Sequence, residues 1–187
     1  DSSSTATITG YDKIGGLVGY HRGTISNSNY DGTINGDSNV GGIAGQNRSG
    51  SITDSYSTGT INTTPDGDPS FDSNSGGLVG KNYESASISD SYSRMNVNSV
   101  DRAGGLVGLN ETSTVENSYS TGTVTDESGS YEGGLIGKFN SGTVTDSYWD
   151  TESSGQSSSG GSATGLTTSE MQGSSASSNM SGFDFTT

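Results

Sequence analysis

The sequence predicts an all-β protein, a parallel β-helix or β-solenoid of about five to six coils, with three short strands per coil. A glycine cell, two glycines followed by two aliphatic residues and a third glycine, recurs at intervals of 26, 35, 28 and 29 residues. Periods of this order are typical of solenoids, propellers and arrays, and a propeller blade needs four strands and about 40 or more residues. The shorter period favours one solenoid coil per repeat. The cells begin at Gly15, Gly41, Gly76, Gly104 and Gly133.

The composition by itself is typical of a disordered chain. Only 25% of the 187 residues are hydrophobic, and the formal net charge is −14. Such a chain usually lacks a core. Here, however, the few apolar residues fall at the same stations in every repeat, which is the arrangement that a thin continuous core requires. The segments are short and rich in Ser, Thr, Val and Ile, which favours strands over helices.

The glycine cell is expected to form the first strand of each coil, with the glycines where the backbone bends or packs closely. Stacked coils place each residue over its counterpart, so the first aliphatic residue of each cell would form an inward ladder. Because side chains alternate along a strand, the second would face outward. The inward ladder comprises Leu17, Ile43, Leu78, Leu106 and Leu135. The outward strip comprises Val18, Ala44, Val79, Val107 and Ile136.

Two further strands are expected in each coil. A β-branched residue in a Ser/Thr frame marks the second strand, and a segment that runs from a tyrosine to another β-branched residue marks the third. The tyrosines would stack at a corner with their rings partly buried, and asparagines after the cell would form a turn ladder. The second-strand ladder is Ile25, Ile52, Ile88, Val115 and Val144, and the third is Ile34, Ile61, Val97 and Val124. The tyrosines are Tyr30, Tyr56, Tyr92, Tyr119 and Tyr148, and the asparagines are Asn47, Asn82 and Asn110.

The chain divides into repeats over residues 1–150, with a partial first coil, and a Ser/Gly-rich C-terminal capping segment over residues 151–187. Residues 1–10 match the third strand of a coil, so the N-terminal end would lie open to a further coil. Loops are expected to leave the coils at residues 62–75, which hold both prolines, and at residues 125–132. Apolar residues of the C-terminal segment are expected to cover the other end. These are Leu166, Met171, Met180, Phe183 and Phe185.

The repeat resembles the GLUG-repeat family. The resemblance rests on "GGLVG", on "SYSTGT" at residues 55–60 and 118–123, and on "DSYWDTESSGQ", and it covers residues 5–150. It implies a module of a large secreted or cell-surface protein of bacteria or archaea. Such proteins include filamentous-haemagglutinin-like adhesins and the stalks of immunoglobulin-A-cleaving metalloproteases. "GLTTSEMQ" and "GFDF" resemble the module that closes these arrays. Ala44 and "SRMN" at residues 93–96 depart from the pattern.

No catalytic residues are predicted. The single histidine, His21, is expected to be an exposed turn residue. Asp54, Asp90 and Asp146 precede the Ser-Tyr pair in three coils, and paired carboxylates can hydrolyse glycosides. The stacking of coils explains that pairing without catalysis. The alternative is a carbohydrate-active or phage-tail-type β-helix, a hydrolase or lyase that acts on polysaccharide.

No cofactor is expected, although one loop could hold calcium. Asp66, Asp68, Asp72 and Asn74 crowd oxygen ligands of the kind that Ca²⁺ prefers, without the spacing of an EF-hand. An ordinary acidic loop is the alternative interpretation. Four sequons permit glycosylation in an exported protein. They begin at Asn47, Asn62, Asn110 and Asn179.

The charge balance, 21 acidic against 7 basic residues, excludes nucleic acid as a partner. No apolar run is long enough for membrane insertion. The expected partners are adjacent modules of a longer surface protein, a second copy joined end to end, or glycans on a host or neighbouring cell. The sequence therefore predicts an extracellular, secreted or cell-surface module, structural or adhesive rather than catalytic, that acts as a rigid stalk or a binding face.

Overall fold

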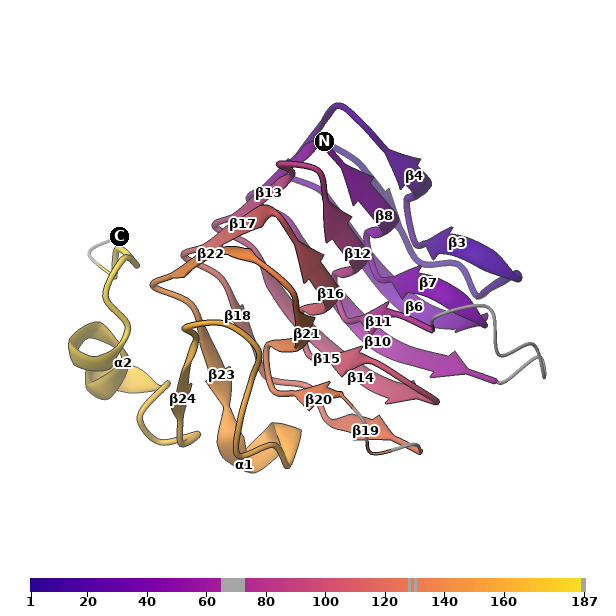
Figure 1. Ribbon diagram of the computed structural model, residues 1–187. Helices are drawn as coiled ribbons and strands as arrows, with labels where there is room; N and C mark the ends of the chain where they lie inside the picture. Colours follow the sequence, from indigo (N-terminus) through magenta and orange to yellow (C-terminus); the bar gives the residue numbers. More distant parts are fainter. Residues whose placement is uncertain (65–72, 128, 130, 186–187) are drawn as a thin grey trace.

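The computed structural model describes residues 1–64, 73–127, 129 and 131–185. In these ranges the chain is a parallel β-solenoid built from four sheets that run along the molecule (Figure 1). Three sheets contain five strands each, and the fourth contains nine strands. The predicted fold class is confirmed.

The nine-stranded sheet, here sheet A, contains the third strand of each coil. Its strands are β1 (Ser3–Ser4), β2 (Ile8–Thr9), β6 (Asn29–Gly36), β10 (Tyr56–Thr63), β14 (Tyr92–Ser99), β18 (Tyr119–Ser120), β19 (Val124–Asp126), β23 (Tyr148–Asp150) and β24 (Thr164–Leu166). Sheet B contains β3 (Asp12–Gly15), β7 (Ser38–Gly41), β11 (Ser75–Gly76), β15 (Ala103–Gly104) and β20 (Glu132–Gly133).

Sheets C and D complete each coil. Sheet C contains β4 (Val18–His21), β8 (Ala44–Arg48), β12 (Val79–Tyr83), β16 (Val107–Glu111) and β21 (Ile136–Phe139). Sheet D contains β5 (Thr24–Ser26), β9 (Ser51–Thr53), β13 (Ser87–Ser89), β17 (Ser113–Glu116) and β22 (Gly142–Thr145). Two short helices follow the last coil, α1 (Thr151–Ser154) and α2 (Gly173–Asn179).

Each coil has four strands rather than three, because the glycine cell spans a corner. In the second coil β7 ends at Gly41 and β8 begins at Ala44. Within the bend, the N–H groups of Ile43 and Ala44 both donate to the carbonyl oxygen of Leu78, at 2.8 and 3.2 Å. The second glycine packs against sheet A, since a Cβ on Gly42 would lie 2.5 Å from that of Ser57. Glycine is needed there for close approach.

The outward strip was predicted wrongly. Ala44, Val79, Val107 and Ile136 are 0% exposed, and Val18 packs against the same core. Alternation holds only along a continuous strand. The bend interrupts the strand, so both aliphatic residues of each cell point inward.

The aliphatic ladders are otherwise confirmed. Ile34, Ile61, Val97 and Val124 pair in register from coil to coil. Ile43, Leu78, Leu106 and Leu135 are 0% exposed. In the first coil, Leu17 and Ile25 are only partly buried.

The predicted asparagine ladder forms, but it lies buried within the strands of sheet C rather than in a turn. Asn47 Nδ2 donates to Asn82 Oδ1 at 3.0 Å, and Asn82 Nδ2 donates to Asn110 Oδ1 at 2.9 Å. His21 occupies this station in the first coil and Phe139 occupies it in the last. His21 is 8% exposed, so the expectation of an exposed turn residue was wrong.

A ladder of serines crosses the turn before sheet A. It was not predicted from the sequence. Except in the last coil, the N–H of each serine donates to Oγ of the serine one coil later, at 3.2–3.3 Å. Each Oγ also donates to the carbonyl oxygen two residues earlier in its own coil. The ladder comprises Ser28, Ser55, Ser91, Ser118 and Ser147.

The carboxylates before this ladder have a conformational explanation. Asp54, Asp90 and Asp146 have φ values of 49°, 50° and 43°, in the left-handed region. Asn27 and Asn117 take the same conformation in the other two coils. Asp and Asn tolerate it better than most residues. The repeated carboxylate is therefore a turn residue.

The tyrosine column on the outer face of sheet A is shorter than predicted. The rings of Tyr56, Tyr92 and Tyr119 stack with centroids 4.9 and 5.0 Å apart and interplanar angles of 2° and 8°. Tyr148 follows Tyr119 in strand register. Tyr30 instead pairs with Ser57 and is 0% exposed. The sequence holds the signal, because Tyr30 lies four residues before its ladder isoleucine and Tyr56 lies five before its own.

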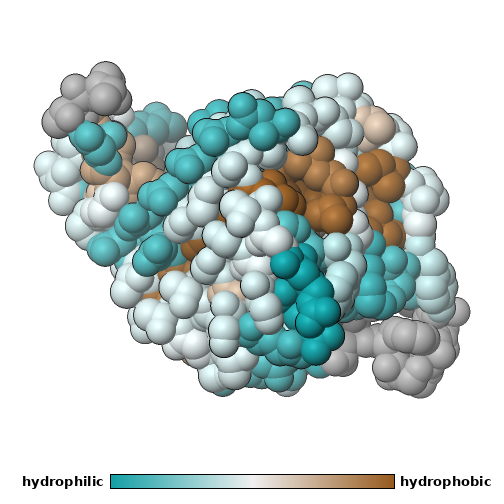
Figure 2. All heavy atoms as spheres, turned by 90° about the horizontal axis from the view of Figure 1, so that it is seen from above, coloured by the Kyte–Doolittle hydropathy of each residue, from teal (hydrophilic) through white to brown (hydrophobic). Residues whose placement is uncertain are grey.

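The two ends of the solenoid differ. At the N-terminal end β1 and β2 pair with β6, with Ile8 over Ile34 as predicted. Apolar surface lies open at this end (Figure 2), where Leu17, Val18 and Ile25 line a hollow of about 330 Å³. At the other end the C-terminal segment covers the last coil. The N–H of Gly134 donates to Ser158 and that of Gly160 donates to Ile136. A C-terminal cap is therefore present, but the residues expected to form it were predicted wrongly. Ala163 packs against the main core, whereas Met171, Met180 and Phe183 pack with Tyr148 in a separate cluster.

Candidate functional site

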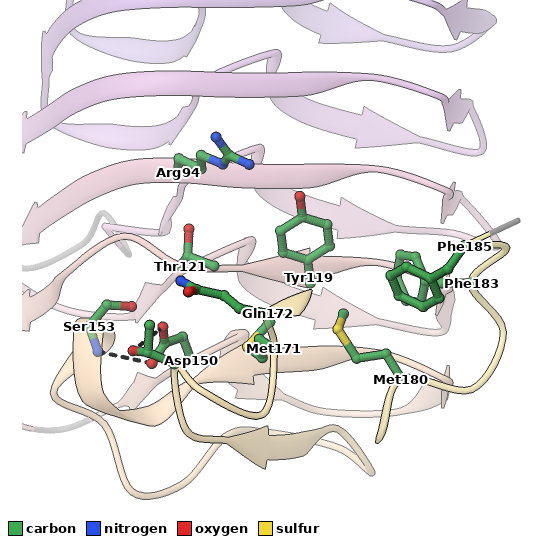
Figure 3. Close-up of a pocket in the computed structure, with 11 residues that line it drawn as sticks. Arg94, Tyr119, Thr121, Asp150, Ser153, Met171, Gln172, Met180, Phe183 and Phe185 are labelled. Carbon is green, nitrogen blue, oxygen red and sulfur yellow. Dashed lines mark hydrogen bonds between the residues drawn. The ribbon is translucent and has the colours of Figure 1, made fainter. Parts of the chain in front are cut away.

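The C-terminal segment and the outer face of sheet A enclose a pocket of about 460 Å³ (Figure 3). Sheet A and the turn after β18 contribute Arg94, Tyr119 and Thr121. The end of β23 and helix α1 contribute Asp150 and Ser153. The remaining residues come from the C-terminal segment: Thr168, Met171, Gln172, Met180, Phe183 and Phe185.

Asp150 holds the floor of this pocket in place. It is the N-cap of α1, and its Oδ1 accepts from the N–H groups of Glu152 and Ser153 at 2.9 and 3.1 Å. Its Oδ2 accepts from Thr168 Oγ1 at 2.7 Å. Both oxygens are engaged and the residue is 3% exposed, so Asp150 is placed to anchor the segment rather than to transfer protons.

A second carboxylate shapes the turn that follows. Glu170 Oε2 accepts from the backbone N–H and from Oγ1 of Thr167, both at 2.8 Å. These hydrogen bonds stabilise the charged form and lower the pKa of Glu170. The turn leads into α2 and sets the position of Met171 and Gln172.

Phe183 forms the apolar wall. Its ring meets Tyr119 edge-on at 5.9 Å and Tyr148 at 6.0 Å, and Phe185 follows at 6.3 Å. Tyr148 packs with Ala176 and Met180 in a small cluster of its own, separate from the main core. The C-terminal segment thus closes the end of the tyrosine column with aromatic and thioether groups.

Arg94 stands at the polar side of the pocket. Its guanidinium carbon lies 5.2 Å from the ring centroid of Tyr92. The neighbouring hydroxyl of Tyr119 stabilises the charged guanidinium and raises the pKa of Arg94. Over the described residues, ion pairs join Lys13, Arg48, Lys81 and Arg102 to carboxylates, and none includes Arg94.

A second polar cluster lies on sheet C, away from this pocket. Arg48 donates to the hydroxyl of Tyr20 at 3.1 Å and pairs with Glu84. The bond from Arg48 lowers the pKa of Tyr20. Burial, together with Tyr20, raises the pKa of Tyr83 to about 12. Each charged group has a partner, so the cluster is a bridge between neighbouring coils.

Of the calcium candidates, Asp66, Asp68 and Asp72 lie outside the described residues. Asn74 is 2% exposed. Its Nδ2 donates to Asn39 Oδ1 at 3.0 Å, and its Oδ1 accepts from Arg102 at 3.2 Å. Within residues 1–64, 73–127, 129 and 131–185 no three His, Asp or Glu side chains cluster as metal ligands would.

The four sequons differ in accessibility. Asn47 and Asn110 belong to the buried ladder and are 0% exposed. Asn62 is half-buried, and its Nδ2 donates to Asn35 Oδ1 at 3.1 Å. Asn179 is exposed at the end of α2. In the folded protein an attached glycan would fit at Asn179 and Asn62 only.

The GLUG motif matches the chain three times, at residues 36–62, 72–98 and 101–125. These repeats are GLUG repeats. Each match ends within a sheet-A strand, β10, β14 or β19, and holds one glycine cell, so one motif corresponds to about one turn of the solenoid. The sequence resemblance is thereby confirmed over residues 36–125.

A similar protein is a "Putative Gly-rich membrane protein" of Evansella cellulosilytica, 42% identical over 73 residues. The match covers 37% of this chain and 8% of that protein, so the chain spans a small part of the relative's length. No solved structure matches. None of the helices that the structure describes is long and apolar enough to cross a membrane.

Proposed function

We propose that this chain is a non-catalytic stalk module of a secreted or cell-surface protein. The observation that supports the proposal is the unbroken coil-to-coil register of four parallel sheets. A repeat array of this kind grows by stacking, because each coil contacts only its neighbours. Rigidity comes from the asparagine and serine ladders, which join adjacent coils through buried side chains.

The extracellular location rests on the family and on the charge. GLUG repeats are expected in surface and secreted proteins, and the Evansella relative is named as a membrane protein. A net charge of −14 favours solubility and keeps long, flat modules from associating along their sides.

The N-terminal end of the solenoid supports a proposal about which structure stacks on the first coil. Sheets B, C and D begin at β3, β4 and β5, and among the described residues none of these strands has a partner on its outer side. Leu17, Val18 and Ile25 remain partly exposed beside them. An unpaired strand edge with apolar surface is apt to pair. The fitting occupant is a further coil of the same kind, from the same polypeptide or from an adjacent module.

Insertion of coils tests the stalk role. Three copies of residues 76–103, inserted in tandem after residue 103, should lengthen the particle by roughly 14 Å, three interstrand spacings. Small-angle X-ray scattering measures the length, and thermal unfolding measures the stability, which should rise. A particle that widens instead of lengthening would refute the proposal.

The alternative, a polysaccharide hydrolase or lyase, has less support. The repeated aspartates take left-handed turn conformations, and both oxygens of Asp150 are hydrogen-bonded. Release of reducing ends or of unsaturated products from acidic polysaccharides would establish the alternative.

A further inference from the structure

The pocket beside the tyrosine column combines groups that the stalk role does not use. Its volume of about 460 Å³ is within the range of small-ligand sites, roughly 300–1,000 Å³. Phe183, Met171 and Met180 provide an apolar side. Figure 3 shows the polar ends of Arg94, Tyr119 and Thr121 on the sheet-A side, with Gln172 reaching in from the C-terminal segment.

Arg94 is the cation that a ligand could pair with. It is exposed, and in the described part of the chain no carboxylate forms an ion pair with it. Its guanidinium lies over the ring of Tyr92, 5.2 Å from the centroid, at the edge of the tyrosine column. A guanidinium held in this way binds a carboxylate through two parallel hydrogen bonds. Asp150, the carboxylate in the pocket lining, is 3% exposed and has both oxygens hydrogen-bonded within the protein. More distant carboxylates are screened beyond about 8 Å at physiological ionic strength.

The hydroxyl of Ser153 is a second, independent indication that a ligand binds in this pocket. Its Oγ is buried in the pocket wall and has no hydrogen-bond partner among the described residues. A buried hydroxyl without a partner is costly and calls for an explanation. Rotation of the Ser153 side chain toward the pocket would let a ligand hydroxyl supply the missing bond.

We propose that this pocket binds a ring-sized ligand that carries a carboxylate, with Arg94 on the carboxylate and Phe183 against the ring. An acidic sugar residue of a glycan and an aromatic acid share this chemistry. Gln172 and Thr121 are placed to bond ring substituents. The inference goes beyond the stalk role and is independent of it, since a rod with an empty flank would still act as a spacer.

Protein-observed NMR titration of the full chain tests the proposal. The probes are methyl β-D-glucuronide, its neutral counterpart methyl β-D-glucoside, and benzoate. The expected result is that amide shifts gather at Tyr119, Thr121 and Gln172 with a carboxylate probe and not with the glucoside. Binding of the glucuronide identifies an acidic sugar as the ligand, and binding of benzoate alone identifies an aromatic acid.

The matched variants are Arg94→Gln and Arg22→Gln, which remove the same charge inside the pocket and on the first coil. Arg94→Gln should lower the affinity for the carboxylate probe at least about tenfold, which is the loss expected when a charge-assisted hydrogen bond is removed. Arg22→Gln should leave affinity unchanged. Equal binding of glucuronide and glucoside, no binding of any probe, or equal losses in both variants would overturn the proposal. Unchanged melting temperatures separate lost binding from lost folding.

Discussion

The two ends of the solenoid bury equivalent side chains to different degrees. Leu135, in the last coil, is 0% exposed beneath the C-terminal segment, whereas Leu17, at the same station of the first coil, is only partly buried. The local sequences are nearly the same, GGLIG and GGLVG. The difference teaches that a coil does not complete its own core. The coil or segment stacked on it does so.

At one inward-facing position of sheet A, the first and the last coil both carry an aromatic residue. Serines fill this station in the three middle coils, where Ser57, Ser93 and Ser120 stack in register. Tyr30 fills it in the first coil and Trp149 in the last, each buried. Tyr30 donates to the carbonyl oxygen of Ala6 at 2.7 Å, and Trp149 donates to that of Gln156 at 3.0 Å. At each end a large ring thus fills the sheet-A side of the interior, while Leu17, Val18 and Ile25 stay partly exposed at the N-terminal end.

The largest effect is expected for a leucine in the middle of the array. Leu106→Ala should lower the free energy of unfolding by about 2–5 kcal/mol, because it leaves a cavity between two coils. Leu17→Ala should cost clearly less, since Leu17 already meets solvent. Urea unfolding of both variants measures the difference. Equal losses would mean that the first coil is as well covered as the middle ones.

The serine ladder should show the same contrast on a smaller scale. Ser118→Ala removes the acceptor of the buried N–H of Ser91, and an unsatisfied buried donor costs about 1–3 kcal/mol. Ser28→Ala removes the acceptor of the partly exposed N–H of Ser2, which water can replace. Thermal unfolding should therefore separate the two variants. A greater loss for Ser28→Ala would contradict a ladder that is strongest between coils.

Acid should loosen the C-terminal segment before the coils. The pKa of Glu170 is lowered in the fold, so its contribution to stability is present above the ordinary Glu value of about 4.3 and is lost as pH falls through the lowered value. Glu170→Gln should thus have a slightly lower melting temperature than the parent near pH 7, and the gap should close below pH ~4. The matched control is Glu127→Gln, which removes an exposed carboxylate outside the C-terminal segment.

The smallest effect is expected from chelation. EDTA should leave the melting temperature unchanged, because buried side-chain hydrogen bonds join the described coils and no three His, Asp or Glu side chains cluster in that part of the chain. A fall of many degrees that disappears in the Asp66/Asp68 double alanine variant would establish a calcium site in that loop.

The repeat made the fold predictable from the sequence. The corners of the coils and the parts outside the repeats could not be predicted in this way. Period and apolar stations predicted the stacking of Ile34, Ile61 and Val97. The same reasoning placed Val79 outside, because sequence alternation does not reveal a bend within the glycine cell. The pocket could not be predicted, since Phe183 and Gln172 lie far in sequence from Arg94 and meet it only when the C-terminal segment folds back.

Hydrogen exchange tests most directly the claim that each coil is stabilised by the coil or segment stacked on it. The comparison is between β4 and β5 in the first coil and β21 and β22 in the last, which are equivalent strands at opposite ends. We predict slower exchange in β21 and β22, which the C-terminal segment covers, and a rise in protection of β4 and β5 when one more coil is fused before residue 1. Equal protection at both ends, or no change on fusion, would contradict the account.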